Sequence, residues 1–249
     1  LLYATFSFIL IPNERKNVES STSTSLNLIK ENVNLLFNDT SKVMNIIDSS
    51  ISSYALMQTF ESDIEGYIGS YVEFLTCKQI AQQMNAIVNT RDYIESIYVY
   101  LPNSKNAYIT NQMKIYHIGS SPDQSWISDV QSAMKNDIFR RHIPGHYYDT
   151  ITITEQNSKG YIVAININAS YFERLLSSLA ITKGQKMFLS KDNDIIIASS
   201  SSNIDINERH STIFSTEIDN FNCVLTSIIP NKELFSYEYN LLFVTIVIS

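Results

Sequence analysis

Apolar residues recur every three or four positions along the first part of the chain. From Asn17 to about Tyr54 they occupy one helical face, with Thr40 as the single polar interruption and no Gly or Pro. The pattern predicts one long helix with an apolar seam of Leu26, Ile29, Val33, Leu36, Val43, Ile47, Ile51 and Tyr54. Such a seam fits either the chain's own core or a partner helix in a homodimer along the N-terminal helix, and both alternatives remain open here.

The helical pattern continues to Asn89 with interruptions at Gly66 and Gly69, and then its period changes to two. Over Ile94–Leu101 the aliphatic residues alternate with tyrosine and serine, which is typical of a strand with one buried face. Turn residues at 102–106 and a second strand at 107–110 complete a hairpin. Ile97 and Val99 therefore share one face of this hairpin, and Tyr98 and Tyr100 share the other.

The next segment is less regular. A loop is expected at 114–124, a short helix at 126–136 and an irregular stretch at 140–148. Strands at 149–155 and 161–166 follow, and a helix at 171–179 has Ser170 and Glu173 as a capping box.

The pattern of strands and turns in the remaining part of the chain predicts a smaller unit of two hairpins. Its strands are expected at 186–190, 195–199, 211–217 and 221–229, with a helix starting at Asn231 after Pro230. Helices followed by antiparallel hairpins predict an α+β fold in which the long helix accompanies two antiparallel sheet modules.

Both ends of the chain are apolar. A membrane helix needs about 20 apolar residues, so residues 1–12 are interpreted as the end of a first transmembrane helix and 237–249 as the start of a second. The alternatives are core elements or a signal-peptide remnant. Arg15 and Lys16 after the first apolar run count mildly against an external location.

The charge and the cysteine content of the chain argue against two classes of protein. A net charge of −7 without a basic stripe argues against a nucleic-acid surface. Two cysteines, Cys77 and Cys223, do not make a disulfide scaffold, and two separate buried thiols are favoured over a pair.

Several local phrases resemble the double Cache (dCache) extracellular sensor domains of bacterial transmembrane receptors. They are the hairpin IESIYVYLPNSKNAYIT, the segment YIVAININASYFERLL, the hairpin KMFLSKDNDIIIAS and the exit IIPNKELF. The hairpin and the exit look most like receptors of the YesM-like sensor histidine kinases and membrane-bound AraC-type regulators.

The resemblance implies a domain organisation. A long helical region would occupy 13–89, a membrane-distal PAS-like module 90–182 and a membrane-proximal PAS-like module 183–236. It also implies an extracellular domain anchored in the cell membrane, whose ligand would be an amino acid, organic acid, sugar or peptide. Amino-acid-binding members carry a Tyr, an Arg followed by aromatics and an Asp, and the spacing of Arg140-Arg141 and Tyr147-Tyr148-Asp149 departs from that pattern.

A binding pocket is predicted where aromatic residues and a few polar groups converge. The expected lining consists of sheet tyrosines and residues of the irregular segment: Tyr98, Tyr100, Tyr108, Trp126, Arg140, His142, Tyr147, Tyr148 and Asp149. Ordinary amphipathic packing of the tyrosines is the alternative. An arginine there would hold a carboxylate through paired hydrogen bonds.

Catalysis and metal binding are not expected. His142 and His146 lie four apart in a Pro-Gly loop without further ligands at zinc spacing, and Asp192 begins a hairpin turn rather than a calcium loop. No nucleophile elbow or phosphate loop occurs, and no cofactor is expected. The sequence predicts a non-enzymatic sensor, with a membrane-tethered enzyme and an adhesion or dimerisation module as alternatives.

Overall fold

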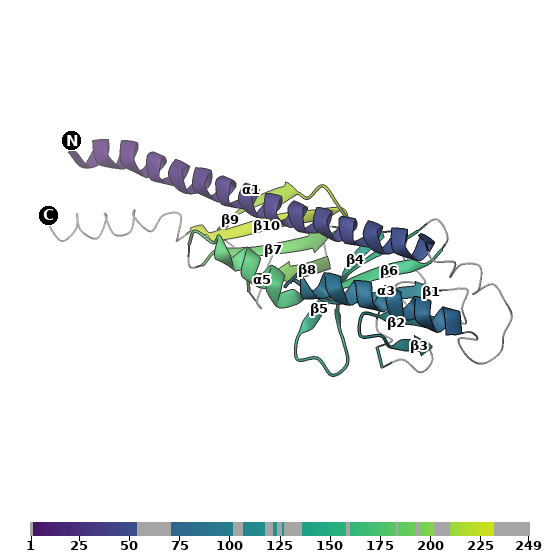
Figure 1. The fold of residues 1–249 in the computed structure, drawn as a ribbon. Coiled ribbons are helices and arrows are strands. Elements are labelled where there is room, and N and C mark those ends of the chain that lie inside the picture. The colour runs from purple at the N-terminus through teal and green to yellow at the C-terminus, as the bar shows by residue number, and fades with distance from the viewer. Residues whose placement is uncertain are drawn as a thin grey trace. The chain divides into compact units, whose positions relative to one another are not determined.

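The computed structural model describes residues 2–53, 71–101, 107–117, 122–123, 126, 136–157, 160–182, 184–192, 195–201 and 210–231. The chain divides into two compact units (Figure 1). The four-stranded unit consists of Leu1–Asn34 and Phe172–Ser249, and the six-stranded unit consists of Leu35–Tyr171. The first helix, α1 (Leu2–Ser53), supplies residues to both.

The six-stranded unit is built on one antiparallel sheet in the order β3-β2-β1-β6-β5-β4. Its strands are β1 (Ile94–Leu101), β2 (Ala107–Thr110), β3 (Ile115–His117), β4 (Asn136–His142), β5 (Asp149–Gln156) and β6 (Ile162–Asn168). Helix α3 (Tyr71–Asn89) contacts β1 and β2.

The two faces of this sheet differ in chemistry. On one face, Ile97 pairs with Ile165 and Val99 with Val163, and all four side chains are buried. On the other face, Tyr98 pairs with Ala164 and Ser96 with Asn166. The predicted division of β1 into an aliphatic and a tyrosine face is confirmed.

Polar contacts anchor α1 to the six-stranded unit at two places. The Arg91 side chain binds Asp39 through Nε–Oδ2 at 2.8 Å and Nη2–Oδ1 at 3.2 Å. Near the end of the helix, Tyr161 donates its hydroxyl to the Asp48 carboxylate, and Asn157 Nδ2 donates to Asp48 at 2.8 Å.

The four-stranded unit has the antiparallel order β8-β7-β10-β9. Its elements are β7 (Lys186–Lys191), β8 (Ile195–Ser199), β9 (Ser211–Glu217), β10 (Cys223–Pro230) and the helix α5 (Ala169–Ser178), which begins before the boundary between the units. Helix α1 is tied to this unit because Asn34 Nδ2 donates to Asp219 at 3.0 Å and Ser25 Oγ donates to the Leu179 carbonyl.

The α+β fold class with a long N-terminal helix and two antiparallel sheets is confirmed. The apolar seam of α1 packs in the chain's own core. Its residues are buried in the unit to which each belongs: Ile29, Val33, Val43, Ile47 and Ile51. The seam therefore does not serve as a dimer interface. Tyr54 and residues 55–70 lie outside the described residues.

Three local predictions are wrong. β3 occupies part of the expected loop at 114–124, and β4 extends into the first three residues of the irregular stretch expected at 140–148. β4 escaped prediction because charged residues follow Phe139 on both faces, which hides the alternation. The cap of α5 is Asn168 rather than Ser170, since Asn168 Oδ1 accepts the Ser170 amide at 2.9 Å.

Cys77 and Cys223 are both buried and are not joined in a disulfide, as predicted. Helix α1 starts at Leu2, earlier than the predicted Asn17. Among the described segments, none of the helices combines the length and the apolar character needed to cross a membrane. Residues 127–135 of the helix expected at 126–136 lie outside the described residues, as does the apolar segment at 237–249.

Candidate functional site

The second face of the six-stranded sheet carries a buried aromatic cluster. It consists of Tyr98, Tyr100, Tyr108, Trp126, Ile162 and Ala164, with Tyr116 and Phe139 packed against it. The ring centroid of Trp126 lies 5.5 Å from that of Tyr98, 6.3 Å from Tyr100 and 5.3 Å from Tyr108. Such tilted and edge-to-face pairs stabilise a cluster by more than their buried area alone.

Two buried polar atoms lack hydrogen-bond partners at this face, one in the cluster and one on the neighbouring Thr110. The indole nitrogen Nε1 of Trp126 and the hydroxyl of Thr110 are buried and make no hydrogen bond to any residue that the structure describes. Thr110 pairs with Tyr98 across the β1–β2 ladder and the Trp126 ring contacts the Tyr98 ring, so both residues are neighbours of Tyr98. A buried donor without an acceptor costs about 1–3 kcal/mol, which a bound molecule could recover.

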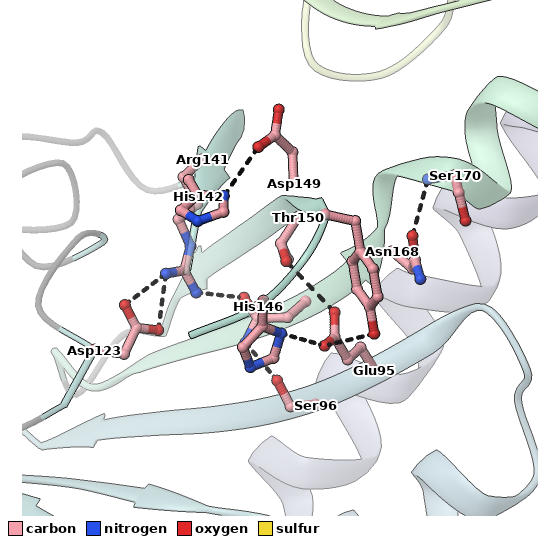
Figure 2. Close-up of polar contacts among 12 residues, drawn as sticks. Glu95, Ser96, Asp123, Arg141, His142, His146, Asp149, Thr150, Asn168 and Ser170 are labelled. Atoms are coloured by element: carbon pink, nitrogen blue, oxygen red, sulfur yellow. Dashed lines mark hydrogen bonds and ion pairs between the residues drawn. The ribbon is translucent and has the colours of Figure 1, made fainter. Parts of the chain in front are cut away.

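A buried ion pair lies beside the aromatic cluster. Arg141 Nη1 lies 2.8 Å from both carboxylate oxygens of Asp123, and the two side chains are only 4% and 6% exposed (Figure 2). Arg141 also donates through Nε to Thr152 at 2.6 Å and through Nη2 to Asn166 at 2.8 Å. All three guanidinium nitrogens are therefore engaged.

The polar network extends along the sheet. Thr152 donates to Asn166 Oδ1 at 2.8 Å, and Asn166 Nδ2 donates to Ser96 at 2.9 Å. Thr152 and Asn166 are fully buried. This face is thus polar and yet shielded from water, unlike an ordinary solvent-facing side of an antiparallel sheet.

Tyr98 contacts the rings of Tyr108 and Trp126 and lies within the electrostatic influence of Asp123 and Arg141. Burial first, and then the Asp123 carboxylate, raise the pKa of Tyr98 to about 12. Its hydroxyl therefore stays protonated at neutral pH and can donate or accept a hydrogen bond.

The structure brings four of the nine predicted site residues together and separates the other five. Tyr98, Tyr100, Tyr108 and Trp126 form the cluster. Arg140, His142 and Asp149 occupy the opposite face, because strand alternation pairs Arg140 with Ile151 and His142 with Asp149. Tyr147 is fully exposed, and Tyr148 is 42% exposed. The structure therefore does not gather all nine residues on one face of the sheet.

Arg140, His142 and Asp149 form their own surface group. Arg140 Nε lies 2.8 Å from Asp149 Oδ2, and His142 Nδ1 lies 3.3 Å from Asp149 Oδ1. The hydrogen bond from Arg140 is the largest cause that holds the pKa of Asp149 below its ordinary value. These half-exposed groups bind one another on the far side of the sheet from the cluster.

A third polar group surrounds Glu95, where the β1–β6 register shifts between Ile94 and Ser96. The bulge directs Glu95 toward the β4–β5 loop, where its carboxylate lies 2.7 Å from His146 Nδ1 (Figure 2). Tyr148 and Thr150 donate to the same carboxylate at 3.4 Å each. The nearby Glu95 charge raises the pKa of Tyr148.

Sequence reasoning missed Asp123, Arg141, Thr110, Thr152 and Asn166. A signal for Thr152 was present, since Thr150, Thr152 and Thr154 alternate with isoleucines and so had to share the second face. Arg141 could have been chosen over Arg140 only after β4 had been recognised as a strand. Among the described residues, no group of three or more candidate metal ligands was found.

The four-stranded sheet carries a shallower candidate. A groove of about 440 Å³ is lined by Phe188, Ser190, Ile213, Ser215, Thr216, Glu217, Val224 and Thr226. Its hydroxyl groups bond locally, with Ser215 and Thr226 at 3.1 Å and Ser190 donating to the Val224 carbonyl at 3.4 Å. This groove has less unmet hydrogen-bonding capacity than the aromatic cluster.

Comparison of the whole fold with solved structures finds bacterial sensor domains. The ligand-binding domain of the Pseudomonas aeruginosa amino-acid chemoreceptor PctB, solved with L-Arg, superimposes with a TM-score of 0.59 at 11% identity over 88% of this chain and 98% of that one. The ligand-binding domain of the Campylobacter jejuni chemoreceptor Tlp3, solved with L-norvaline, gives 0.56 at 10% identity over 89% and 94%.

The chain shares the fold of these ligand-binding domains. The extracellular domain of soHK1S-Z6, a protein described as a histidine kinase, gives a TM-score of 0.57 at 12% identity over 95% of this chain and 100% of that one. No protein-family model matches the sequence, and no curated protein matches it. At these identities the sensor-domain fold is shared, while the chemistry of the site belongs to this chain.

Proposed function

We propose that this chain is the extracytoplasmic ligand-sensing region of a bacterial transmembrane receptor and that a small polar molecule binds in the six-stranded unit. The observation that carries the proposal is the unpartnered Trp126 indole nitrogen inside a buried aromatic cluster beside a polar network. Solved domains with the same fold were crystallised with L-Arg and L-norvaline, which supports a small-molecule ligand. The enzyme alternative is favoured by no observation on the described residues.

Signal transfer would use the ends of the chain. We place residues 1–12 and 237–249 at the ends of two membrane helices, with the long helical region at 13–89, the distal module at 90–182 and the proximal module at 183–236. Ligand binding would shift the population of conformations of the helices that enter the membrane. A YesM-like histidine kinase or an AraC-type regulator is the proposed form of the whole receptor.

A thermal-shift screen tests ligand sensing. The purified chain is heated with amino acids, organic acids, sugars and short peptides, and a ligand at 100 times its dissociation constant should stabilise the fold by about 2.7 kcal/mol. A library in which no compound raises the melting temperature would remove the support for direct sensing.

A homodimer along α1 is the proposed assembly, but through a different face from the predicted seam. Leu28, Leu35 and Ile46 are 51%, 64% and 44% exposed and fall on one stripe of the helix, since their spacings of seven and eleven are near whole numbers of turns. This stripe is also the observation that favours the dimerisation-module alternative. That alternative predicts dimers in the absence of any small molecule.

A further inference from the structure

The cation of the candidate site is already neutralised within the chain. Arg141 is the one cation that the described residues of the six strands place on the cluster face, and Asp123 is its counter-ion. Nε and Nη2 of Arg141 are held by Thr152 and Asn166. A carboxylate ligand would have to displace Asp123 or remain buried without a counter-charge, and both cost free energy.

The groups at the site that still lack hydrogen-bond partners are uncharged. Trp126 is fully buried and its Nε1 can only donate, so it requires an acceptor atom. The Thr110 hydroxyl can donate or accept, and it is also unpartnered. The Trp126 ring contacts the rings of Tyr98, Tyr100 and Tyr108, so apolar surroundings favour a flat or aliphatic body next to that acceptor.

We infer that the site takes a small uncharged molecule whose oxygen acceptor binds Trp126 Nε1, and that the Asp123–Arg141 pair excludes free carboxylates and zwitterions. This inference rests on the proposed function, because it names the ligand class of the same site. It makes Asp123 the residue that determines charge selectivity. The amino-acid ligands of the structurally similar domains fall in the excluded class.

The test uses molecules that share a skeleton and differ in charge. L-valine, isovalerate and isovaleramide form one series, and L-phenylalanine, hydrocinnamate and hydrocinnamamide form the other. Trp126 is the single tryptophan of the chain, so its emission reports directly on the site. The two amides should give saturable emission changes at concentrations where the four charged molecules give none. Tighter binding of any carboxylate or zwitterion would overturn the inference.

Asp123→Asn should reverse the selectivity. This change leaves the Arg141 charge unbalanced, so isovalerate and hydrocinnamate should gain at least tenfold in affinity over the unchanged protein. If the variant melts at a lower temperature, isovalerate should raise its melting temperature more than isovaleramide does. Asp149→Asn is the matched control, because Asp149 lies on the opposite face and its loss should change no affinity. An Asp123→Asn protein that still excludes carboxylates contradicts the charge argument.

Trp126→Phe tests the hydrogen bond between Trp126 Nε1 and the acceptor atom of the ligand. The ring stays while the donor is removed, so amide affinity measured by calorimetry should fall about fivefold to tenfold, as expected for one lost hydrogen bond. Unchanged amide affinity would overturn the role of Nε1. The outcomes also separate the two proposals: a charged ligand found in the broad thermal-shift screen overturns only the inference, whereas a screen without any ligand overturns the proposed function as well.

Discussion

Arg140 and Arg141 are neighbours in the chain and yet have different environments, because successive side chains of a strand point to opposite faces. Arg141 is 7% exposed and has buried partners, whereas the Arg140 side chain is 30% exposed beside Asp149. The one-residue difference determines which guanidinium lies on the face of the candidate site.

The two arginines should differ strongly in their effect on stability. Arg141→Ala leaves the Asp123 carboxylate buried without its counter-ion, so we expect unfolding to become easier by about 3–5 kcal/mol. Arg140→Ala removes a half-exposed pair and should cost about 0–1 kcal/mol. Urea denaturation of both variants measures the difference, and equal losses would contradict the assignment of faces.

The Asp39–Arg91 pair should make stability depend on pH. The hydrogen bond from Arg91 is the main cause that lowers the pKa of Asp39 below its ordinary value. A lowered folded-state pKa means that the pair stabilises the fold above about pH 4, where unfolded Asp is also ionised. That stabilisation is lost as the pH falls through the lowered folded-state pKa.

Asp39→Asn isolates this contribution. Because the Asp39 side chain is 36% exposed, solvent screening limits the effect to about 1 kcal/mol at neutral pH. Denaturation at a series of pH values should show the difference between the two proteins shrinking once the pH falls below about 4. A difference that stays constant down to acid pH would show that Asp39 acts through packing instead.

At the scale of elements, α1 presents two chemically similar faces with different roles. The seam that contains Ile47 is buried in the core, while the stripe that contains Ile46 is exposed. Periodicity identified the buried face correctly, since an amphipathic helix covers its core with its richest apolar stripe. It did not reveal that a second, sparser stripe of large aliphatic residues stays in contact with solvent.

Ile46 and Ile47 therefore provide a matched pair. Ile47→Ala should destabilise the fold by about 2–5 kcal/mol, because it empties a fully packed site. Ile46→Ala should change stability by about 0.5 kcal/mol or less.

If the exposed stripe forms the dimer, Leu35→Glu and Ile46→Glu should produce monomers in sedimentation experiments at unchanged melting temperature. Dimers that survive both changes would place the interface elsewhere.

At the scale of the whole molecule, the two units share one helix. Leu26, Ile29 and Val33 of α1 are buried in the four-stranded unit, and Val43, Ile47 and Ile51 are buried in the six-stranded unit. Unfolding either unit exposes the apolar side chains of its half of α1. A continuous helix without tertiary packing over half its length is marginal in water.

This sharing predicts a single cooperative melting transition. Leu225→Ala in the four-stranded unit and Ile165→Ala in the six-stranded unit should each lower the melting temperature of the whole chain. Scanning calorimetry would record one peak that shifts in both variants. Two peaks, each moved by only one of the substitutions, would show that the units unfold independently.

The sequence by itself determined the α+β class, the long helix, its buried seam and the division of β1 into an aliphatic and a tyrosine face, because each depends on local periodicity. Tertiary structure alone decided the site. Arg141 meets Asp123, 18 positions earlier, only because a strand that local patterning hid aligns with β5 and β6. Whether a charged side chain is engaged or available to a ligand depends on partners distant in the chain, and residue spacing does not carry that information.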